Sequence, residues 1–232
     1  MTTTPETIDS IPVSIDHKEL QRRLHMKPGA QWDRVVSLAE SAQRFIEPKV
    51  VFKTSFIDEK LADGVIVDGV KLTSTVLRKQ LDEVERVFPY VMTIGPKWEE
   101  IAEGSDDYLD QYYLDSIANV ALISSRRFFT NHLQTRFALG NLSRLGPGSL
   151  ENWPISEQAH LFTIIGNVES AIGVTLTDSF LMMPRKSSSG IYFATEVPFY
   201  ACQLCPRDKC PSRKAAYDAN KANEYALTKP SA

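Results

Sequence analysis

The fold expected for this chain follows from one stretch, Ile172-Gly-Val-Thr-Leu-Thr-Asp-Ser-Phe-Leu-Met-Met-Pro-Arg-Lys-Ser-Ser-Ser-Gly-Ile-Tyr-Phe193. Residues 173–195, which overlap this stretch, predict two strands joined through the small residues 187–190, because serine and glycine between strand-forming runs are typical of a turn. Strands joined by a short turn lie side by side and antiparallel. The stretch therefore predicts an antiparallel sheet.

The residues upstream add helices and more strands to that sheet. Predicted strands cover residues 11–15, 50–56, 65–67, 70–72 and 89–94, with the pairs Asp63-Gly64 and Asp68-Gly69 as type I′ hairpin turns. Predicted helices cover residues 17–26, 31–46, 73–87, 107–138 and 154–166. The sequence thus indicates an α+β fold, with a twisted, mainly antiparallel sheet and long packed helices. The aromatic residues at helical spacing in 107–138 are interpreted as core packing.

Length and composition favour a single globular domain. The chain has 232 residues, 43% of them hydrophobic, which suffices for one core. We expect a flexible N-terminus at residues 1–12, the α+β domain at 13–200, a cysteine segment at 201–214 and a polar tail at 215–232.

Charge and hydropathy argue against two classes of partner. The formal net charge is -3, with acidic and basic residues intermixed, so no footprint for nucleic acid is expected. No apolar run approaches the roughly 20 residues of a membrane-spanning helix, and the first residues resemble no signal peptide. We therefore expect a cytoplasmic protein without nucleic-acid or membrane partners.

All three cysteines fall within nine positions, at Cys202, Cys205 and Cys210. Thiolates this close in sequence favour a metal site, and no further cysteine is present for a disulfide framework. A zinc site would need a fourth ligand, such as Asp208 or a distant histidine. An iron–sulfur cluster would lack one of its usual four cysteines. Reduced cysteines without a metal are the remaining alternative.

A second candidate site is the turn Arg144-Leu-Gly-Pro-Gly-Ser149. A planar guanidinium beside glycines can hold a carboxylate in bidentate fashion, with free main-chain amides of the turn directed at the same ligand. The turn by itself is also an ordinary glycine turn. The sequence thus predicts an anion-binding site at Arg144, Gly146, Pro147, Gly148 and Ser149.

Several motifs resemble the activation domain of cobalamin-dependent methionine synthase. The resemblance covers roughly residues 106–200. Its motifs are Ile172-Gly173, Leu176-Thr-Asp-Ser179, Met182-Met-Pro184, Ser187-Ser-Ser-Gly-Ile-Tyr-Phe193, the pair Phe199-Tyr200, and Arg144 with Pro147-Gly148. Trp153, Glu157-Gln158, Leu161-Phe162 and the cysteines are similar to those of free-standing relatives of that domain.

The resemblance implies a function and a site. It implies that the protein reactivates an oxidised cobalamin by reductive methylation with S-adenosylmethionine. The cobalamin would belong to a partner corrinoid methyltransferase, with methionine synthase as the first candidate. It would act as an accessory subunit, with the cobalamin carried by the partner. Arg144, Gly146, Pro147, Gly148, Ser149 and Tyr192 would line the S-adenosylmethionine site. An iron–sulfur cluster at the cysteines would replace the external flavoprotein donor.

The chain also departs from that pattern. Ser149 stands where the domain has an aromatic residue, and no counterpart is found for an aspartate segment near the N-terminus of the domain. The alternative function is a docking or chaperone module for a corrinoid protein, stabilised by zinc or a cluster, without methyl transfer of its own.

Overall fold

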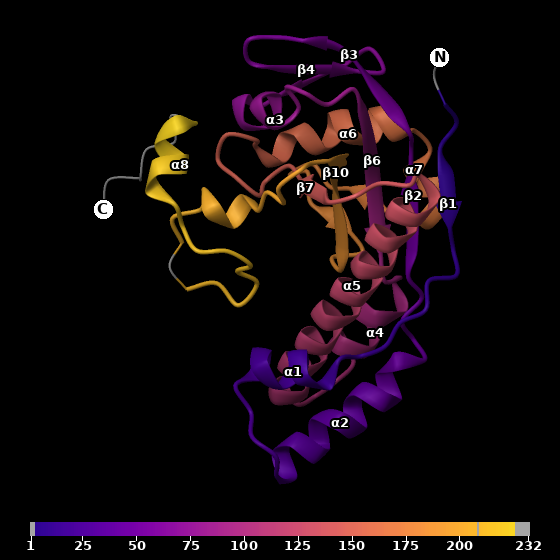
Figure 1. Cartoon of the computed structure of the whole chain (residues 1–232). Coiled ribbons are helices and arrows are strands. Elements are labelled where there is room, and N and C mark those ends of the chain that lie inside the picture. Colours follow the sequence, from indigo (N-terminus) through magenta and orange to yellow (C-terminus); the bar gives the residue numbers. More distant parts are fainter. Residues whose placement is uncertain (1–2, 208, 226–232) are drawn as a thin grey trace.

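The computed structural model describes residues 3–207 and 209–225 (Figure 1). The helices are α1 (His17–Leu24), α2 (Ala30–Gln43), α3 (Thr75–Gln80), α4 (Lys97–Glu103), α5 (Tyr108–Arg136), α6 (Gln158–Ile165), α7 (Val168–Ile172) and α8 (Ala219–Glu224), with short 3₁₀ turns η1 (Ile155–Glu157) and η2 (Ala201–Gln203). The strands are β1 (Glu6–Ile8), β2 (Lys49–Phe52), β3 (Ser55–Lys60), β4 (Gly64–Val67), β5 (Val70–Thr73), β6 (Arg86–Thr93), β7 (Leu142–Leu145), β8 (Thr175–Leu176), β9 (Met182–Met183) and β10 (Ser187–Ala194).

Eight of the described strands form one antiparallel sheet around β6, which confirms the predicted α+β fold. β10 pairs along one side of β6 and then with β7, while β2 and β3 share the other side in succession. Pro89 lies within β6, level with the break between β2 and β3, where its carbonyl accepts the amide of Lys53 at 3.0 Å. A central strand tolerates this proline because the partner ladder is interrupted there.

Alternation along the strands divides the core into two faces. In β10, Ile191 and Phe193 join the cluster that contacts α6 and α7, whereas Tyr192 joins the cluster that contains Phe129 of α5. The same period of two places Val91 on the first face and Tyr90 on the second. The sheet is therefore packed between α6 and α7 on one face and the C-terminal half of α5 on the other.

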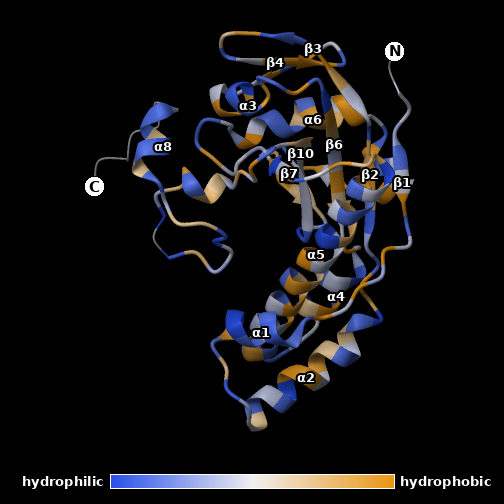
Figure 2. Cartoon of the chain, in the orientation of Figure 1, coloured by the Kyte–Doolittle hydropathy of each residue, from blue (hydrophilic) through white to orange (hydrophobic). Residues whose placement is uncertain are grey.

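The N-terminal half of α5 serves a separate helical layer. It packs with α1, α2 and α4 around residues such as Leu20, Trp98 and Ile117, which are essentially inaccessible to solvent. In Figure 1, this layer lies below the sheet. In Figure 2, the central strand β6 is largely hydrophobic, whereas α8 is hydrophilic. The prediction of a long helix at 107–138 is confirmed, although its aromatic residues divide between the core (Tyr113, Phe129) and the surface (Tyr108, Tyr112).

Two expectations from the key stretch and the N-terminus are wrong in detail. Residues 187–190 are no turn: they begin β10 and pair with residues 90–93 of β6, while the hairpin lies upstream between β8 and β9. Residues 11–15 form no strand. Strand β1 lies instead at Glu6–Ile8, inside the segment expected to be flexible, and pairs with β2. Pro12, which has no amide hydrogen, lies in the segment that leaves the sheet.

Local turn chemistry also differs from the expectation at two places. Asp68 and Gly69 both have positive φ, as a type I′ turn requires, but Gly64 does not, and it already belongs to β4. The helix expected at 73–87 ends at Gln80 because residues from Arg86 onward join β6.

The residues after β10 pack onto the sheet domain. Leu204 and Ala222 are buried in the cluster that contains Ile191, and the amide of Asp218 donates to the carbonyl of Gln203 at 2.8 Å. In Figure 1, α8 lies on the side of the molecule away from β1. None of the described helices is both long enough and apolar enough to pass through a membrane.

One buried ion pair joins three parts of the sheet domain. Lys53 Nζ lies 2.7 Å from Asp68 Oδ2, with both side chains only 9% exposed. Ser55 donates to the same carboxylate at 2.8 Å, and Lys53 also donates to the carbonyl of Ile164 at 3.2 Å. The pair thus ties the turn between β4 and β5 to the β2–β3 junction and the end of α6.

The change Asp68→Asn should lower the free energy of unfolding by about 3 kcal/mol, because it leaves a buried ammonium without its counter-charge. Asparagine tolerates the positive φ at this position, so backbone strain is not added. Urea unfolding measures the loss. Asp63→Asn is the control: its pair with Lys71 is about half exposed, so its loss should change the free energy of unfolding far less than the loss of the buried pair. Equal effects of the two changes would contradict this account.

Close backbone contact between β7 and β10 requires a glycine at position 190. A Cβ on Gly190 would lie 2.3 Å from the carbonyl oxygen of Leu145, and φ is +153°. We expect Gly190→Ala to lower the free energy of unfolding by more than about 2 kcal/mol in urea, because backbone cannot yield as a side chain can. Gly140→Ala is the matched control, since no atom lies within 4 Å of its added Cβ. A tolerated Gly190→Ala would refute the close contact.

Candidate functional site

The structure brings together Arg144 and Tyr192, two of the residues predicted to form a site. They stand opposite each other in the register of β7 and β10. Leu145 lies in the cluster under α6 and α7, so alternation directs Arg144 to the other face, beneath α5. Tyr192 lies in the cluster of that face.

Hydrogen bonds connect these two residues to their neighbours on β6 and α5. Arg144 Nη1 donates to the hydroxyl of Tyr90 at 2.9 Å, and the rings of Tyr90 and Tyr192 have centroids 5.1 Å apart. The hydroxyl of Tyr192 lies 3.0 Å from Thr130 Oγ1. Thr130 in turn donates to the carbonyl of Arg126 one helical turn earlier, at 2.8 Å. We call Tyr90, Arg126, Thr130, Arg144 and Tyr192 the Arg144 cluster.

The environment of the cluster raises the pKa of both Tyr192 and Arg144. Burial, with Tyr90 as a further cause, raises the pKa of Tyr192 to about 12. Burial disfavours the charged form of Arg144, but the oxygens of Tyr90 and Tyr192 outweigh it, so its pKa is raised. At neutral pH, Arg144 is therefore a cation whose hydrogen-bond partner on the protein is the hydroxyl of Tyr90. The rest of its guanidinium fork can serve a ligand.

Arg126 adds a second cation to the cluster. It interacts electrostatically with Arg144, Tyr90 and Tyr192, and burial followed by the charge of Arg144 lowers its pKa. Its neighbour Arg127 is exposed. Two guanidinium groups thus interact electrostatically with the tyrosines, which the sequence did not predict.

The glycine turn after Arg144 is arranged differently from the prediction. The amide of Gly148 donates to the carbonyl of Trp153 at 2.7 Å. The amide of Ser149 donates to the carbonyl of Gly146 at 3.1 Å. Both amides are therefore committed within the turn, and the prediction that they are free for a ligand is wrong.

The other residues of the turn have structural roles. Gly146 is required by packing, since a Cβ there would lie 2.7 Å from the carbonyl oxygen of Ser189. Pro147 is buried, and the side chain of Ser149 donates back to the carbonyl of Gly146. The structure thus places Arg144 and Tyr192 at the cluster but gives Gly146, Gly148 and Ser149 contacts within the fold.

The pair Glu157-Gln158 also has a structural role. Glu157 Oε2 accepts the amide of Thr73 at 2.8 Å, and Gln158 Nε2 donates to the carbonyl of Phe180 at 2.9 Å. Gln158 also accepts a hydrogen bond from the hydroxyl of Ser189. These contacts tie α6 to β5 and β10.

The guanidinium of Arg213 organises the cysteine segment. It donates to the carbonyls of Cys202, Ala215 and Cys205 at 3.0, 3.1 and 3.2 Å. The amide of Lys214 points at Cys202 Sγ from 3.5 Å. Upstream, the amide of Phe199 donates to Ser143 Oγ at 2.7 Å. The segment is thereby attached next to Arg144, and Cys202 interacts electrostatically with that arginine.

The predicted metal site at Cys202, Cys205 and Cys210 is not confirmed. The three thiols are free and half-buried, and the described residues contain no group of three histidine, cysteine, aspartate or glutamate side chains that could hold a metal ion. Asp208, a candidate fourth ligand, lies outside the described residues. As placed, the thiols do not fit a metal centre.

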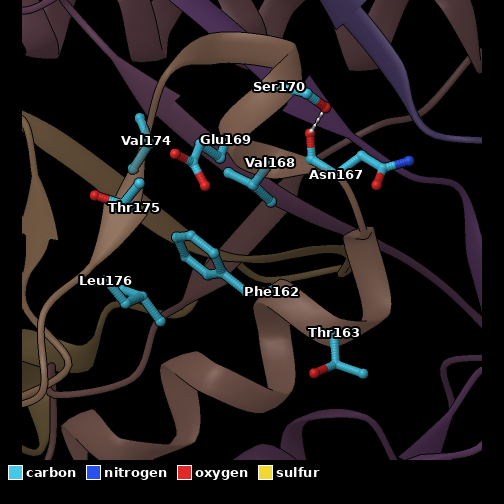
Figure 3. A pocket seen from close by; sticks show the side chains of 9 residues that line it. All are labelled: Phe162, Thr163, Asn167, Val168, Glu169, Ser170, Val174, Thr175 and Leu176. Atoms are coloured by element: carbon cyan, nitrogen blue, oxygen red, sulfur yellow. Dashed lines mark hydrogen bonds between the residues drawn. The ribbon is translucent and has the colours of Figure 1, made fainter.

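A hollow of 730 Å³ lies elsewhere, between α6, α7 and β8 (Figure 3). Phe162, Val168 and Leu176 give it an apolar part, and Glu169 is its one ionisable lining residue. None of the predicted site residues lines it. We therefore keep the Arg144 cluster as the candidate site.

Sequence reasoning missed Tyr90, Arg126 and Thr130. Helical spacing puts Arg126 and Thr130 on one face of the helix, and alternation puts Tyr90 on the same side of its strand as Phe88 and Met92. Those patterns indicate faces. They do not indicate which face meets Arg144.

Comparisons with known proteins agree with this architecture. Residues 145–215 match the family described as "Vitamin B12 dependent methionine synthase, activation domain". The structure "Crystal Structure of the MetH Reactivation Domain bound to AdoHcy" has a TM-score of 0.60 and 14% sequence identity, covering 86% of this chain and 81% of that one. No curated protein sequence matches the chain. Residues 145–215 therefore match this activation domain in sequence, and the chain as a whole shares the fold of a MetH reactivation domain.

Proposed function

We propose that this protein takes part in the reactivation of an oxidised corrinoid cofactor on a partner methyltransferase. Methionine synthase is the first candidate for that partner. The methyl donor would be S-adenosylmethionine. In this reaction the corrinoid cofactor would take up one electron from an external donor and the methyl group of the sulfonium. S-adenosylhomocysteine would be released. Support comes from the family match over residues 145–215 and from the shared fold with a reactivation domain bound to AdoHcy.

The observation that carries the proposal is the position of Arg144. It lies immediately before the matched segment, opposite Tyr192, as a half-buried cation that donates a hydrogen bond to the hydroxyl of Tyr90. A guanidinium in that state retains donors in a planar fork, which suits the carboxylate of an amino-acid ligand. We propose that Arg144 holds this carboxylate and that Tyr192 lines the same site. Gly146, Pro147, Gly148 and Ser149 would shape it through the turn.

One observation favours the second candidate, a docking module without methyl transfer. The amides of Gly148 and Ser149 are committed within the turn, which leaves fewer donors for a small ligand than the sequence predicts. Such a module would hold a corrinoid protein without affinity for the methyl donor. Binding of AdoHcy separates the two candidates, since a module that cannot bind it cannot present S-adenosylmethionine.

We expect the wild-type chain to bind AdoHcy in a calorimetric titration, and Arg144→Ala to weaken that binding by at least about 30-fold, because the carboxylate loses a partly desolvated counter-charge. Arg127→Ala is the control, since it removes the same charge from an exposed position of α5. Circular dichroism of both variants verifies the fold. Unchanged affinity in Arg144→Ala would refute the assignment of Arg144, and a wild-type chain without affinity would favour the docking module.

The role of Cys202, Cys205 and Cys210 stays a prediction from the sequence. If an iron–sulfur cluster replaces the external donor, protein purified without oxygen should contain iron and sulfide and absorb visible light. Metal and sulfide analysis measures this directly. One equivalent of zinc without visible absorbance would exclude electron transfer by these residues and would favour a zinc-stabilised segment.

A further inference from the structure

The side chain of Arg144 reaches its partner across a whole strand. Arg144 belongs to β7 and Tyr90 to β6, and β10 lies between them because it pairs with both. Neighbouring strands are about 4.8 Å apart, so the two main chains are separated by roughly 10 Å. The hydrogen bond of 2.9 Å from Arg144 Nη1 to the hydroxyl of Tyr90 is therefore made over β10, by two long side chains that extend toward each other.

Strand β10 leaves room for this contact at Gly190. Gly190 stands directly opposite Tyr90 in the ladder, and alternation directs Ser188 and Tyr192, two positions away on either side, to the same face. Because Gly190 has no side chain, β10 presents only main chain between Ser188 and Tyr192 on this face. Two side chains from the flanking strands can therefore meet over the strand at this level.

Tyr90 is itself held in place. Its side chain is buried, and the centroid of its ring lies 5.1 Å from that of Tyr192 and 5.5 Å from that of Phe129. Its hydroxyl oxygen also lies 3.3 Å from Ser188 Oγ. An arginine can only donate, so the oxygen of Tyr90 accepts from Arg144 and its hydrogen is left for Ser188. Arg144 therefore meets an acceptor whose position is fixed.

The contact with Tyr90 sets the direction of the Arg144 guanidinium. Within residues 3–207 and 209–225, it is the one hydrogen bond that this guanidinium makes. A guanidinium is a rigid planar fork, so a bond to one nitrogen also orients the donors on the others. A long side chain that is already oriented loses less freedom when a ligand binds. The contact is thus suited to prepare Arg144 for a bidentate acceptor.

We propose that Tyr90 is a positioning residue for the ligand carboxylate, because it holds the guanidinium of Arg144 in the orientation in which the remaining donors meet that group. This role rests on the proposed function, in which Arg144 binds the carboxylate of S-adenosylmethionine or AdoHcy. Tyr90 acts through Arg144 and does not contact the ligand. Loss of its hydroxyl therefore weakens the carboxylate contact and leaves the rest of the ligand site unchanged.

Calorimetric titration of the full chain with AdoHcy measures this role in Tyr90→Phe, which removes one hydroxyl and retains the ring. We expect the affinity to fall by about tenfold, the loss typical of a hydrogen bond to a charged group. Tyr113→Phe is the matched control, because Tyr113 is also buried but belongs to the helical layer, and it should retain the wild-type affinity. Unchanged affinity in Tyr90→Phe would overturn the proposal.

A double-mutant cycle separates positioning from a merely structural effect. If Tyr90 acts through Arg144, Tyr90→Phe should cost no further affinity for AdoHcy in the Arg144→Ala background, because the group that it positions is gone. An equal loss in both backgrounds would show that the hydroxyl supports the fold or contacts the ligand directly. That result would also overturn the proposal.

Chemical modification of Arg144 tests the contact without any ligand. Phenylglyoxal reacts with accessible arginines, and mass spectrometry of the digested protein gives the rate at each one. We expect Arg144 to react about fivefold faster in Tyr90→Phe, because its guanidinium is released from an acceptor. Arg78 is the internal reference and should keep its rate, since it is another half-buried arginine and is held by the carbonyl of Leu61 at 3.0 Å. Unchanged reactivity of Arg144 would refute the contact.

The two readouts distinguish this role from the proposed function. A wild-type chain without affinity for AdoHcy would refute the proposed function together with the carboxylate role, whereas the reactivity of Arg144 would still decide whether Tyr90 holds it. Equal binding of AdoHcy by the wild type and Tyr90→Phe would leave the proposed function standing and overturn the role of Tyr90.

Discussion

The pairing of β10 with β6 is the constraint on which the rest of the structure depends. The register runs over seven residue pairs, from Ser187 opposite Thr93 to Phe193 opposite Val87. Gly190, which stands opposite Tyr90 in this ladder, has no side chain, and this lets the carbonyl of Leu145 approach the strand. β7 can therefore pair with the other side of β10. Once β7 is placed, alternation of side chains directs Arg144 to the face with Tyr90 and Tyr192.

The two faces of that sheet carry different kinds of side chain. The face under α6 and α7 is filled with aliphatic and aromatic side chains. The face under α5 combines aromatic rings with hydroxyls and guanidinium groups. α5 can serve both the helical layer and this polar face because its 29 residues extend from one to the other. Its two halves pack in different clusters, with Ile117 in the helical layer and Phe129 against the sheet.

The C-terminal segment changes the electrostatics of this face. The chain as a whole is weakly acidic, but Lys214, which follows the loop-organising Arg213, interacts electrostatically with Arg126 and Arg144. A single guanidinium can organise a loop in this way because its five donors lie in a rigid plane. The cysteines of the same loop interact with Arg144 through Cys202. The segment is thus a part of the candidate site as well as a part of the core through Leu204.

Local patterns in the sequence determined the α+β class, the long helix and the hairpin turn at Asp68-Gly69. These features depend on neighbouring residues, so that helical and strand periods and turn residues suffice to predict them. The meeting of Tyr90 with Arg144, and the use of the turn amides of Gly148 and Ser149 within the turn, were decided by the tertiary structure. Those contacts join residues far apart in the chain, and they follow from strand register and from the crossing of α5 over the sheet, which no local pattern encodes.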